Sequence, residues 1–315
     1  MIWLTWRQHR AQLLFAAAVL AAFAAVVFVT GSRMRDSFGS SGLGACLASG
    51  RDCGALSEEF LDQYGTVVNS TVYLVVLPVL IGLFWGAPLL ARELEQGTHR
   101  LVWTQTTSRT HWLTVKFAAL IATTILAGLG LAALLSWWFR PFQQVQALSR
   151  INPDVFGLVG IAPIGYALFA FALGAAAGTV LHRVIPAMAV TLVGFIAVRL
   201  VVAGLRERFL APLTVSYPAG EPSPRAGRGD WIVSNSGFVD GSGRHFDSLA
   251  QVCPIEGTDR AARLACLNEH GIQQIDVFHP DSHFWPLQGI ETGIFVALAV
   301  LLLAFTAWWA VRRIG

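Results

Sequence analysis

Long runs of apolar residues alternate with short polar segments along this chain. Because about 20 apolar residues of helix cross the hydrocarbon core of a bilayer, we expect six transmembrane helices. The expected spans cover residues 13–30, 67–90, 117–139, 155–181, 185–205 and 289–311. Proline and glycine interrupt the second and fourth spans, which lipid tolerates when neighbouring groups satisfy the freed carbonyls. The predicted fold is therefore an all-α polytopic membrane protein.

Composition agrees with this prediction. Of the 315 residues, 55% are hydrophobic and only 13% are charged, whereas soluble domains carry about 25% charged residues. The net charge of +3 is scattered, and no basic stripe with interleaved aromatic residues indicates a nucleic-acid partner. The first span differs from a signal peptide because its apolar run is longer than about 15 residues and no cleavage site follows it.

Basic residues give the six spans a direction. Most of them lie on one side, near residues 7–10, in the loop 91–116, near residue 183 and at residues 312–313. Cytoplasmic loops carry the excess of lysine and arginine. We therefore expect a multi-pass protein of the cell membrane with both termini in the cytoplasm.

All four cysteines fall in the two segments that this topology places outside, 31–66 and 206–288. The simplest pairing is Cys46–Cys53 and Cys253–Cys266, as expected in an oxidising compartment. Three connectivities are possible, and sequence cannot choose among them. The alternative is free or metal-binding thiols, although their spacing matches no standard zinc pattern.

The two outer segments differ in character. Residues 31–66 form a polar loop rich in glycine and serine, and residues 206–288 form a small α+β segment stapled by a disulfide. In the latter, Trp231 opens an expected strand, a turn follows at Asp240, and residues 258–270 form an expected short helix.

One arginine and one glutamate lie within expected spans, at similar depth in the membrane. An ionisable residue in lipid is a functional candidate, so we expect Arg199 and Glu291 to pair. The pair would hold two helices together, contribute to substrate passage, or reflect snorkelling of the arginine. Two small-residue motifs, at residues 82–86 and 174–178, allow close helix contact, either within the chain or between subunits.

The loop 91–116 is the longest predicted cytoplasmic segment, and it combines charges with apolar residues. This pattern indicates a helix that docks on a partner or one that lies on lipid headgroups. The candidate contact residues are Arg92, Glu93, Glu95, Gly97, Leu101, Trp103, Arg109 and Trp112.

The motif Arg92-Glu93-x-Glu95-x-Gly97-Thr98, with the apolar triplet and the Thr-Ser-Arg109 segment after it, resembles the coupling loop of type-2 permeases of ATP-binding-cassette exporters. The start of the chain and residues 278–295 resemble actinobacterial members of that family. The resemblance implies that the loop docks on a separate ATPase chain, and that two permease subunits, identical or different, assemble in the bilayer. The large outer segment before the last span departs from many relatives.

The sequence contains no phosphate-binding loop and no H-E-x-x-H or G-x-S-x-G motif. We therefore expect no catalytic residue, metal or cofactor in this chain, and ATP and Mg on the partner ATPase. The expected segments are 1–30, 31–66, 67–90, 91–116, 117–205, 206–288 and 289–315. The alternative is a receptor or sensor whose outer segment 206–288 binds a ligand. An intramembrane enzyme is disfavoured, because no Ser/His or Asp/Asp pair lies at mid-membrane depth.

Overall fold

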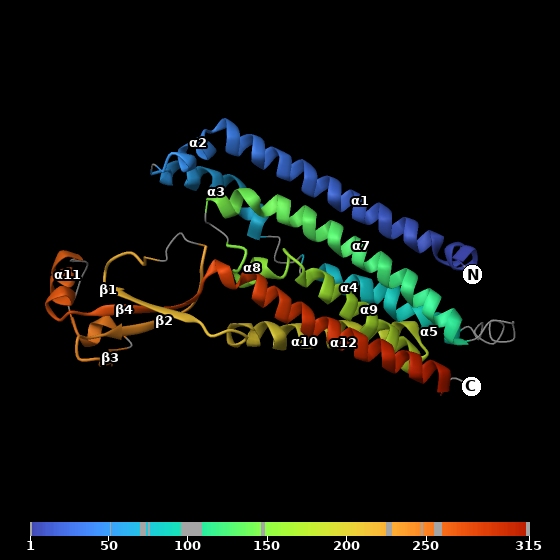
Figure 1. Ribbon diagram of the computed structural model, residues 1–315. Coiled ribbons are helices and arrows are strands. Elements are labelled where there is room, and N and C mark those ends of the chain that lie inside the picture. The colour runs from blue at the N-terminus through green and yellow to red at the C-terminus, as the bar shows by residue number, and fades with distance from the viewer. Residues whose placement is uncertain are drawn as a thin grey trace.

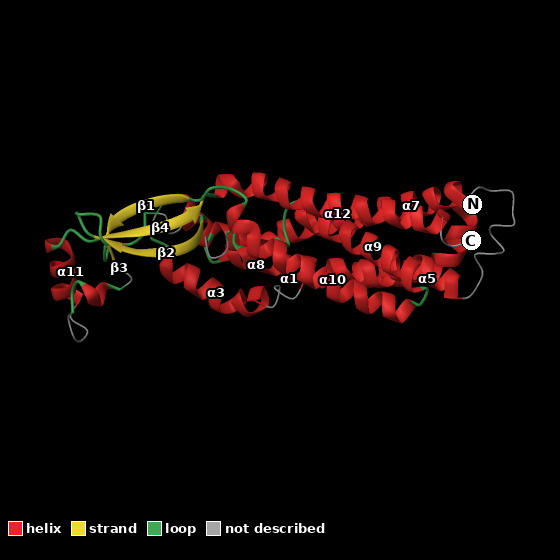
Figure 2. Cartoon of the chain, turned by 90° about the horizontal axis from the view of Figure 1, so that it is seen from below, coloured by secondary structure: helices red, strands yellow, loops and turns green. Residues whose placement is uncertain are grey.

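The computed structural model describes residues 2–50, 52–69, 74, 76–95, 109–145, 149–224, 229–246, 248–254 and 260–312. These residues form an elongated helical bundle with a small sheet projecting from one end (Figure 1). The start of α1 and the end of α12 both lie at the opposite end of the bundle (Figures 1 and 2).

The longer helices are α1 (Ile2–Ser40), α3 (Gly54–Asn69), α5 (Ala87–Glu95), α7 (Arg109–Gln144), α9 (Ala162–Leu181), α10 (Val184–Leu205), α11 (Arg260–Glu269) and α12 (Phe284–Arg312). The shorter ones are α2 (Leu43–Ala48), α4 (Leu77–Ile81), η2 (Gly82–Gly86), α8 (Pro153–Phe156), η3 (Arg206–Arg208), η4 (Leu249–Gln251) and η5 (Asp281–His283). The strands are β1 (Leu213–Pro218), β2 (Trp231–Val239), β3 (His245–Phe246) and β4 (Gln273–His279).

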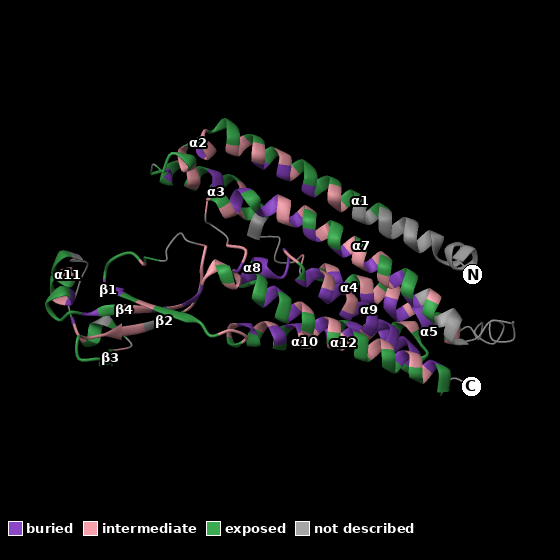
Figure 3. Cartoon of the chain, in the orientation of Figure 1, coloured by how far each residue is buried: buried purple, intermediate pink, exposed green. Residues whose placement is uncertain are grey.

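Helix α9 lies at the centre of the bundle, and 15 of its 20 residues are buried (Figure 3). It contacts α4, η2, α5, α7, α10 and α12. Its sequence is apolar on every side and rich in alanine and glycine, which is typical of a helix surrounded by other helices. Small side chains let the neighbouring backbones approach closely.

Five helical segments of the described chain are long and apolar enough to cross a membrane. They are Leu77–Glu95, Phe117–Gln144, Ala162–Leu181, Val184–Arg208 and Asp281–Arg312. The outer face of α10 illustrates their character: Ile185 is 80% exposed, and Val193 and Leu200 are each 68% exposed. Apolar side chains exposed in this way along a whole helix are suited to contact with lipid.

The first of the six expected spans lies within α1. At about 1.5 Å per residue, the 39 residues of this helix extend roughly 58 Å, well beyond the bilayer core. The side chains of residues 1–17, 19 and 20 lie outside the described set, so α1 is not among the five apolar segments above.

The second and fourth spans begin later than expected. The second starts at Leu77, after α3 has ended at Asn69, and Pro78 occupies the first turn of α4. The fourth starts at Ala162 instead of residue 155, because the chain from Gly157 to Ile161 is irregular, with Gly157, Leu158 and Val159 buried. Proline lacks the backbone N–H that a continuous helix needs, so it favours the first turn.

The second span changes helix type along its length. The segment Gly82–Gly86 is a π-helix between α4 and α5. Its hydrogen bonds join residues five apart in the chain, whereas those of an α-helix join residues four apart. Both end residues of the π-helix are buried. Because glycine has no side chain, the wider turn can pack closely against the neighbouring helix α9.

The expectation of a polar loop over 31–66 differs from the structure, which is mainly helical there. Helix α1 continues to Ser40, and α2 and α3 follow. Met34, Leu43 and Phe60 are buried, and Phe60 packs edge-on against Phe38 at 5.9 Å between ring centroids. Leu56 and Phe60 are four residues apart, which is a helical spacing. The serine and glycine residues around them favour the interpretation as a loop and hide this helical pattern.

The sheet confirms the expected small α+β segment beside the helical bundle. Its four antiparallel strands have the order β1-β4-β2-β3. Strand β2 begins at Trp231 as expected, and Asp240 Oδ1 holds the following turn by accepting the N–H groups of Ser242 and Arg244, at 2.8 and 3.1 Å. The hydrogen bond from the Ser242 hydroxyl, followed by the backbone bond from Arg244, lowers the pKa of Asp240 to about 2. Residue 258, the expected start of the short helix, lies outside the described residues, and Gly271 follows the end of α11 with a φ of 59°.

Candidate functional site

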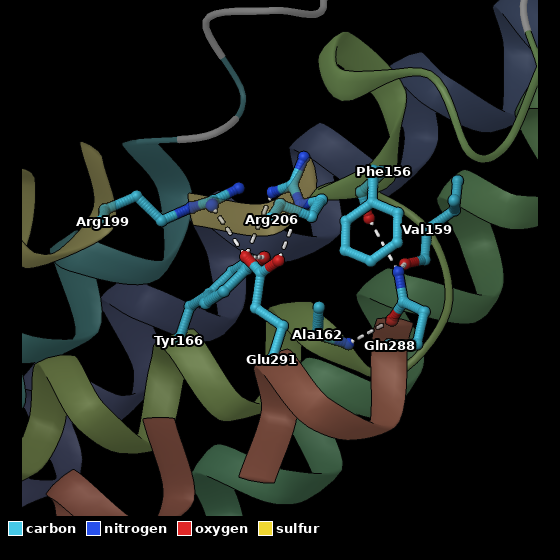
Figure 4. A network of polar contacts seen from close by, with 8 residues as sticks. All are labelled: Phe156, Val159, Ala162, Tyr166, Arg199, Arg206, Gln288 and Glu291. Atoms are coloured by element: carbon cyan, nitrogen blue, oxygen red, sulfur yellow. Dashed lines mark hydrogen bonds and ion pairs between the residues drawn. The ribbon is translucent and has the colours of Figure 1, made fainter. Parts of the chain in front are cut away.

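A buried polar cluster surrounds Glu291, which lies in the second turn of α12 (Figure 4). We call it the Glu291 clamp; its members are Tyr166, Arg199, Arg206 and Glu291. Oε1 of Glu291 accepts hydrogen bonds from Arg199 Nη1 at 2.9 Å and Tyr166 Oη at 2.5 Å. Arg206 donates to both carboxylate oxygens, from Nε at 2.7 Å and from Nη2 at 3.1 Å. The clamp therefore joins α9, the α10–η3 segment and α12.

The spacing of the two arginines explains how both reach one carboxylate. Arg199 and Arg206 are seven residues apart, which is about two helical turns, so they lie on one face. Aromatic rings support both guanidinium groups: Arg199 lies 4.1 Å from the centroid of Tyr166, and Arg206 lies 4.2 Å from that of Phe156. Contacts of this kind stabilise a cation that has left water.

The clamp is closed rather than open to a ligand. Glu291 has no exposed surface, Arg206 is 2% exposed and Arg199 is 8% exposed. Four hydrogen bonds occupy the carboxylate, which leaves little capacity for another partner. Two arginines face one glutamate, so the group carries one excess positive charge, which burial makes costly. This arrangement is suited to fixing three helices relative to one another.

One turn before Glu291, Gln288 fixes the start of α9. Its Oε1 accepts the backbone N–H groups of Ile161 and Ala162 at 2.9 and 2.7 Å, and its Nε2 donates to the carbonyls of Phe156 and Val159 at 2.9 and 3.2 Å (Figure 4). The side chain has no exposed surface. Gln288 thus satisfies four backbone groups of the irregular segment that delayed the fourth span.

The two small-residue motifs meet each other inside the chain, in what we call the glycine seam. A Cβ added at Gly82 would lie 2.4 Å from the carbonyl oxygen of Ala170, and one added at Gly174 would lie 2.4 Å from that of Gly82. Gly86 and Gly178 make similar approaches to opposing backbone. The π-helix and α5 therefore pack backbone to backbone against α9, and the motifs serve internal packing.

At the other end of the bundle, the structure describes part of the expected partner-docking loop. Arg92, Glu93 and Glu95 lie in the last turn of α5, where Arg92 and Glu95 are exposed. Glu95 Oε2 accepts the backbone N–H of Val184 at 3.3 Å, which links this end to the start of α10.

The remaining loop residues are described incompletely. Arg109 and Trp112 lie in the first turns of α7, and their side chains are outside the described set. Gly97, Leu101 and Trp103 lie outside the described residues. The loop thus begins and ends at the same end of the bundle as the two chain termini (Figure 1).

Both expected disulfides are present, Cys46–Cys53 and Cys253–Cys266, with Cα–Cα distances of 6.0 and 6.1 Å. His270 Nδ1 lies 3.8 Å from the Cys266 sulfur. Metal ions bind thiolates, and these two sulfurs are already bonded to each other. The trio of Cys253, Cys266 and His270 is therefore a disulfide beside a histidine and not a metal centre.

The structure brings Arg199 and Glu291 together, and it adds members that the sequence prediction missed. The sequence places Arg206 in the outer segment, because it comes directly after the apolar run that ends at Leu205. Tyr166 and Gln288 are uncharged, so the search for ionisable residues within apolar runs does not find them. The signal available for Arg206 was its spacing of seven from Arg199, and for Gln288 its spacing of three from Glu291.

A family model described as "ABC-2 membrane transporter related" matches residues 17–206, more than half of the chain. The match covers α1 from residue 17 onward, continues through α10 and ends before the sheet. No curated protein and no solved structure matches the chain.

Proposed function

Because this chain belongs to the ABC-2 membrane transporter related family, and is thus a multi-pass membrane subunit of a transporter, we propose that it is the permease of an ATP-driven exporter. In this proposal the chain forms the substrate pathway with a second permease copy, identical or different. A separate ATPase chain binds ATP and Mg, because the sequence has no phosphate-binding loop.

The observation that carries the proposal is the place of the loop between α5 and α7. The end of α5 and the start of α7, which flank this loop, lie at the end of the bundle away from the sheet, as do the start of α1 and the end of α12 (Figure 1). The excess of basic residues at that end makes it the cytoplasmic side in our proposal. An ATPase docked there would act directly on α5 and α7.

The glycine seam gives that motion a path into the bundle. Helix α5 continues into the π-helix Gly82–Gly86, which contacts the backbone of α9. Glu95 also links α5 to α10 through Val184. In the proposed mechanism, movement of the loop shifts α5 against α9 and α10, while the Glu291 clamp keeps their far ends together. Alternating access requires that substrate bind the two resulting states differently.

The sheet and both disulfides lie at the other end, which we place outside the cell. Disulfides persist in oxidising compartments, so their location agrees with this orientation. A receptor that binds ligand through the sheet is the competing function. The family match favours transport, because it covers the bundle helices from α1 to α10 and ends at residue 206, before the sheet.

To test the proposal, the chain is co-expressed with an ATP-binding-cassette ATPase whose gene neighbours its own, and both are purified in lipid. We expect the ATPase to co-purify and to hydrolyse ATP in a vanadate-sensitive manner. Arg92→Glu reverses an exposed charge at the docking end and should reduce both signals. Arg33→Glu makes the same change on an exposed residue of α1 near the sheet end and serves as the matched control. A second variant, Leu101→Glu, places a charge on an apolar residue of the loop. If both Arg92→Glu and Leu101→Glu bind the ATPase and support hydrolysis as well as the wild type, the docking assignment is refuted.

A further inference from the structure

The chain passes between the sheet and the bundle through a narrow region that contains two adjacent histidines. His279 ends β4 and has no exposed surface. Its Nδ1 lies 3.1 Å from Nδ1 of His283 in η5, and its Nε2 lies 3.1 Å from the carbonyl oxygen of Glu207 in η3. The ring also lies over Trp231 of β2 at 5.1 Å between centroids. His279 therefore joins β4 to three other elements.

Hydrogen-bonding rules fix where the protons lie. A carbonyl oxygen only accepts, so Nε2 of His279 carries a proton and donates it to Glu207. In a neutral ring the other nitrogen, Nδ1, then has a free lone pair. The contact between the two Nδ1 atoms must therefore be an N–H···N bond in which His283 is the donor.

The arrangement of the rings supports a hydrogen bond and excludes a shared metal ion. The ring centroids are 5.4 Å apart, and the two Nδ1 atoms are 3.1 Å apart. The difference is about the sum of two imidazole ring radii, so the nitrogens point almost straight at each other. A metal bound to both would have to lie off this line, where neither lone pair points.

This geometry accepts one extra proton and rejects a second. The first can bind Nε2 of His283, and the resulting imidazolium still donates from Nδ1 to His279. The second would have to bind Nδ1 of His279, where it would face the N–H of His283 head-on. Two like charges would then oppose each other at hydrogen-bonding distance. The contact must break before both rings are protonated.

Charged groups on the neighbouring elements are already paired. On η3, Glu207 lies 4.0 Å from Arg208. On η5, Asp281 pairs with Arg150 at 2.7 Å, and its backbone N–H is accepted by Asp230 at 3.1 Å. Burial is the largest influence on His279 and lowers its pKa; the hydrogen bond to the Glu207 carbonyl raises the pKa by less, and the adjacent His283 lowers it again. The folded contact thus favours the less protonated pair.

We propose that His279 and His283 form an acid-sensitive latch that holds the sheet to the bundle and releases it when both rings become protonated. The sign follows from linkage. The open state binds one proton more than the closed state once the pH falls below the ordinary histidine pKa of about 6.5. The latch is closed above that pH and weakens as the pH falls. This inference does not depend on the proposed transport function.

The test is hydrogen–deuterium exchange of the full-length protein in detergent between pH 7 and pH 5, corrected for intrinsic exchange rates. Carboxylates mostly titrate below this range. Peptides from β4, η3 and η5 should open about tenfold more per pH unit below pH 6.5. Peptides from α9 should show no such slope.

His283→Gln is the decisive variant, because the amide can present either its N–H or its oxygen to His279 and so tolerates both protonation states. It should flatten the pH slope, and His279→Gln should do the same if it folds. His245→Gln, at an exposed histidine of β3, is the matched control and should keep the wild-type slope. A flat wild-type profile, or an equal slope in wild type and His283→Gln, would overturn the latch.

Discussion

Glu291→Gln keeps the size of the side chain and removes the charge that balances two buried arginines. The glutamine can still accept one or two hydrogen bonds, but Arg199 and Arg206 then share no anion among the described residues of the clamp. Removing one member of a buried ion pair costs about 3–5 kcal/mol, because the remaining charge stays buried. We expect a loss of this size in the free energy of unfolding.

The two arginines should not be equivalent. Arg206 makes two bonds to the carboxylate and is the more buried of the two, whereas Arg199 makes one. Arg199→Met leaves one arginine facing one glutamate, so it removes the excess charge together with a single bond. Its cost should be at most about 1–2 kcal/mol, since the lost bond is offset by relief from a buried charge. Arg206→Met should fall between Arg199→Met and Glu291→Gln.

The measurement is equilibrium unfolding in mixed detergent, followed by tryptophan fluorescence. Asp281→Asn is the matched control, because its pair with Arg150 is more than one-third exposed on both sides and should be worth about 0–1 kcal/mol. Two results would contradict the reasoning: a Glu291→Gln variant as stable as the control, or an Arg199→Met variant as unstable as Glu291→Gln. A stable Glu291→Gln protein with altered substrates would instead assign the clamp to substrate passage.

Three further predictions concern other parts of the molecule. Gly82→Ala should destabilise the bundle by about 1–3 kcal/mol through overpacking against α9, whereas Gly130→Ala, with open space at its Cβ position, should be neutral or stabilising in the same unfolding assay. Replacing Cys253 and Cys266 by serine should remove about 3 kcal/mol from the sheet, seen as faster proteolysis there with unchanged bundle stability. His182→Gly should stabilise the end of α9 by about 1 kcal/mol, because His182 has a φ of 55°, which glycine adopts without strain. If the variant gains this stability but no longer activates the ATPase, His182 contacts the ATPase.

Hydropathy located the helical bundle well, because lipid selects for long apolar runs whatever lies beside them. It located the ends of the spans less well. The apolar run 155–181 contains Val155 and Phe156, which are buried by packing and not by helix continuation. Their place depends on Gln288, which lies more than 100 residues later in the sequence. No local pattern contains that information.

The polar site was predictable in part for a related reason. Arg199 and Glu291 stand out because charge is rare within apolar runs. Tyr166 does not, since a tyrosine in a membrane helix is ordinary until a carboxylate is seen beside it. Similarly, the pairing of the glycine motifs follows from which helices are neighbours, and sequence alone left that open.

The π-helix at Gly82–Gly86 has a consequence for how relatives of this chain are compared. Such a turn commonly corresponds to one extra residue within an α-helix. Removing that residue would rotate everything that follows by roughly 100°. A relative with a continuous helix here would need a single-residue gap in its alignment. Without that gap, Arg92 and Glu95 would be matched to residues on a different face of the helix, and a shared docking surface would look unrelated.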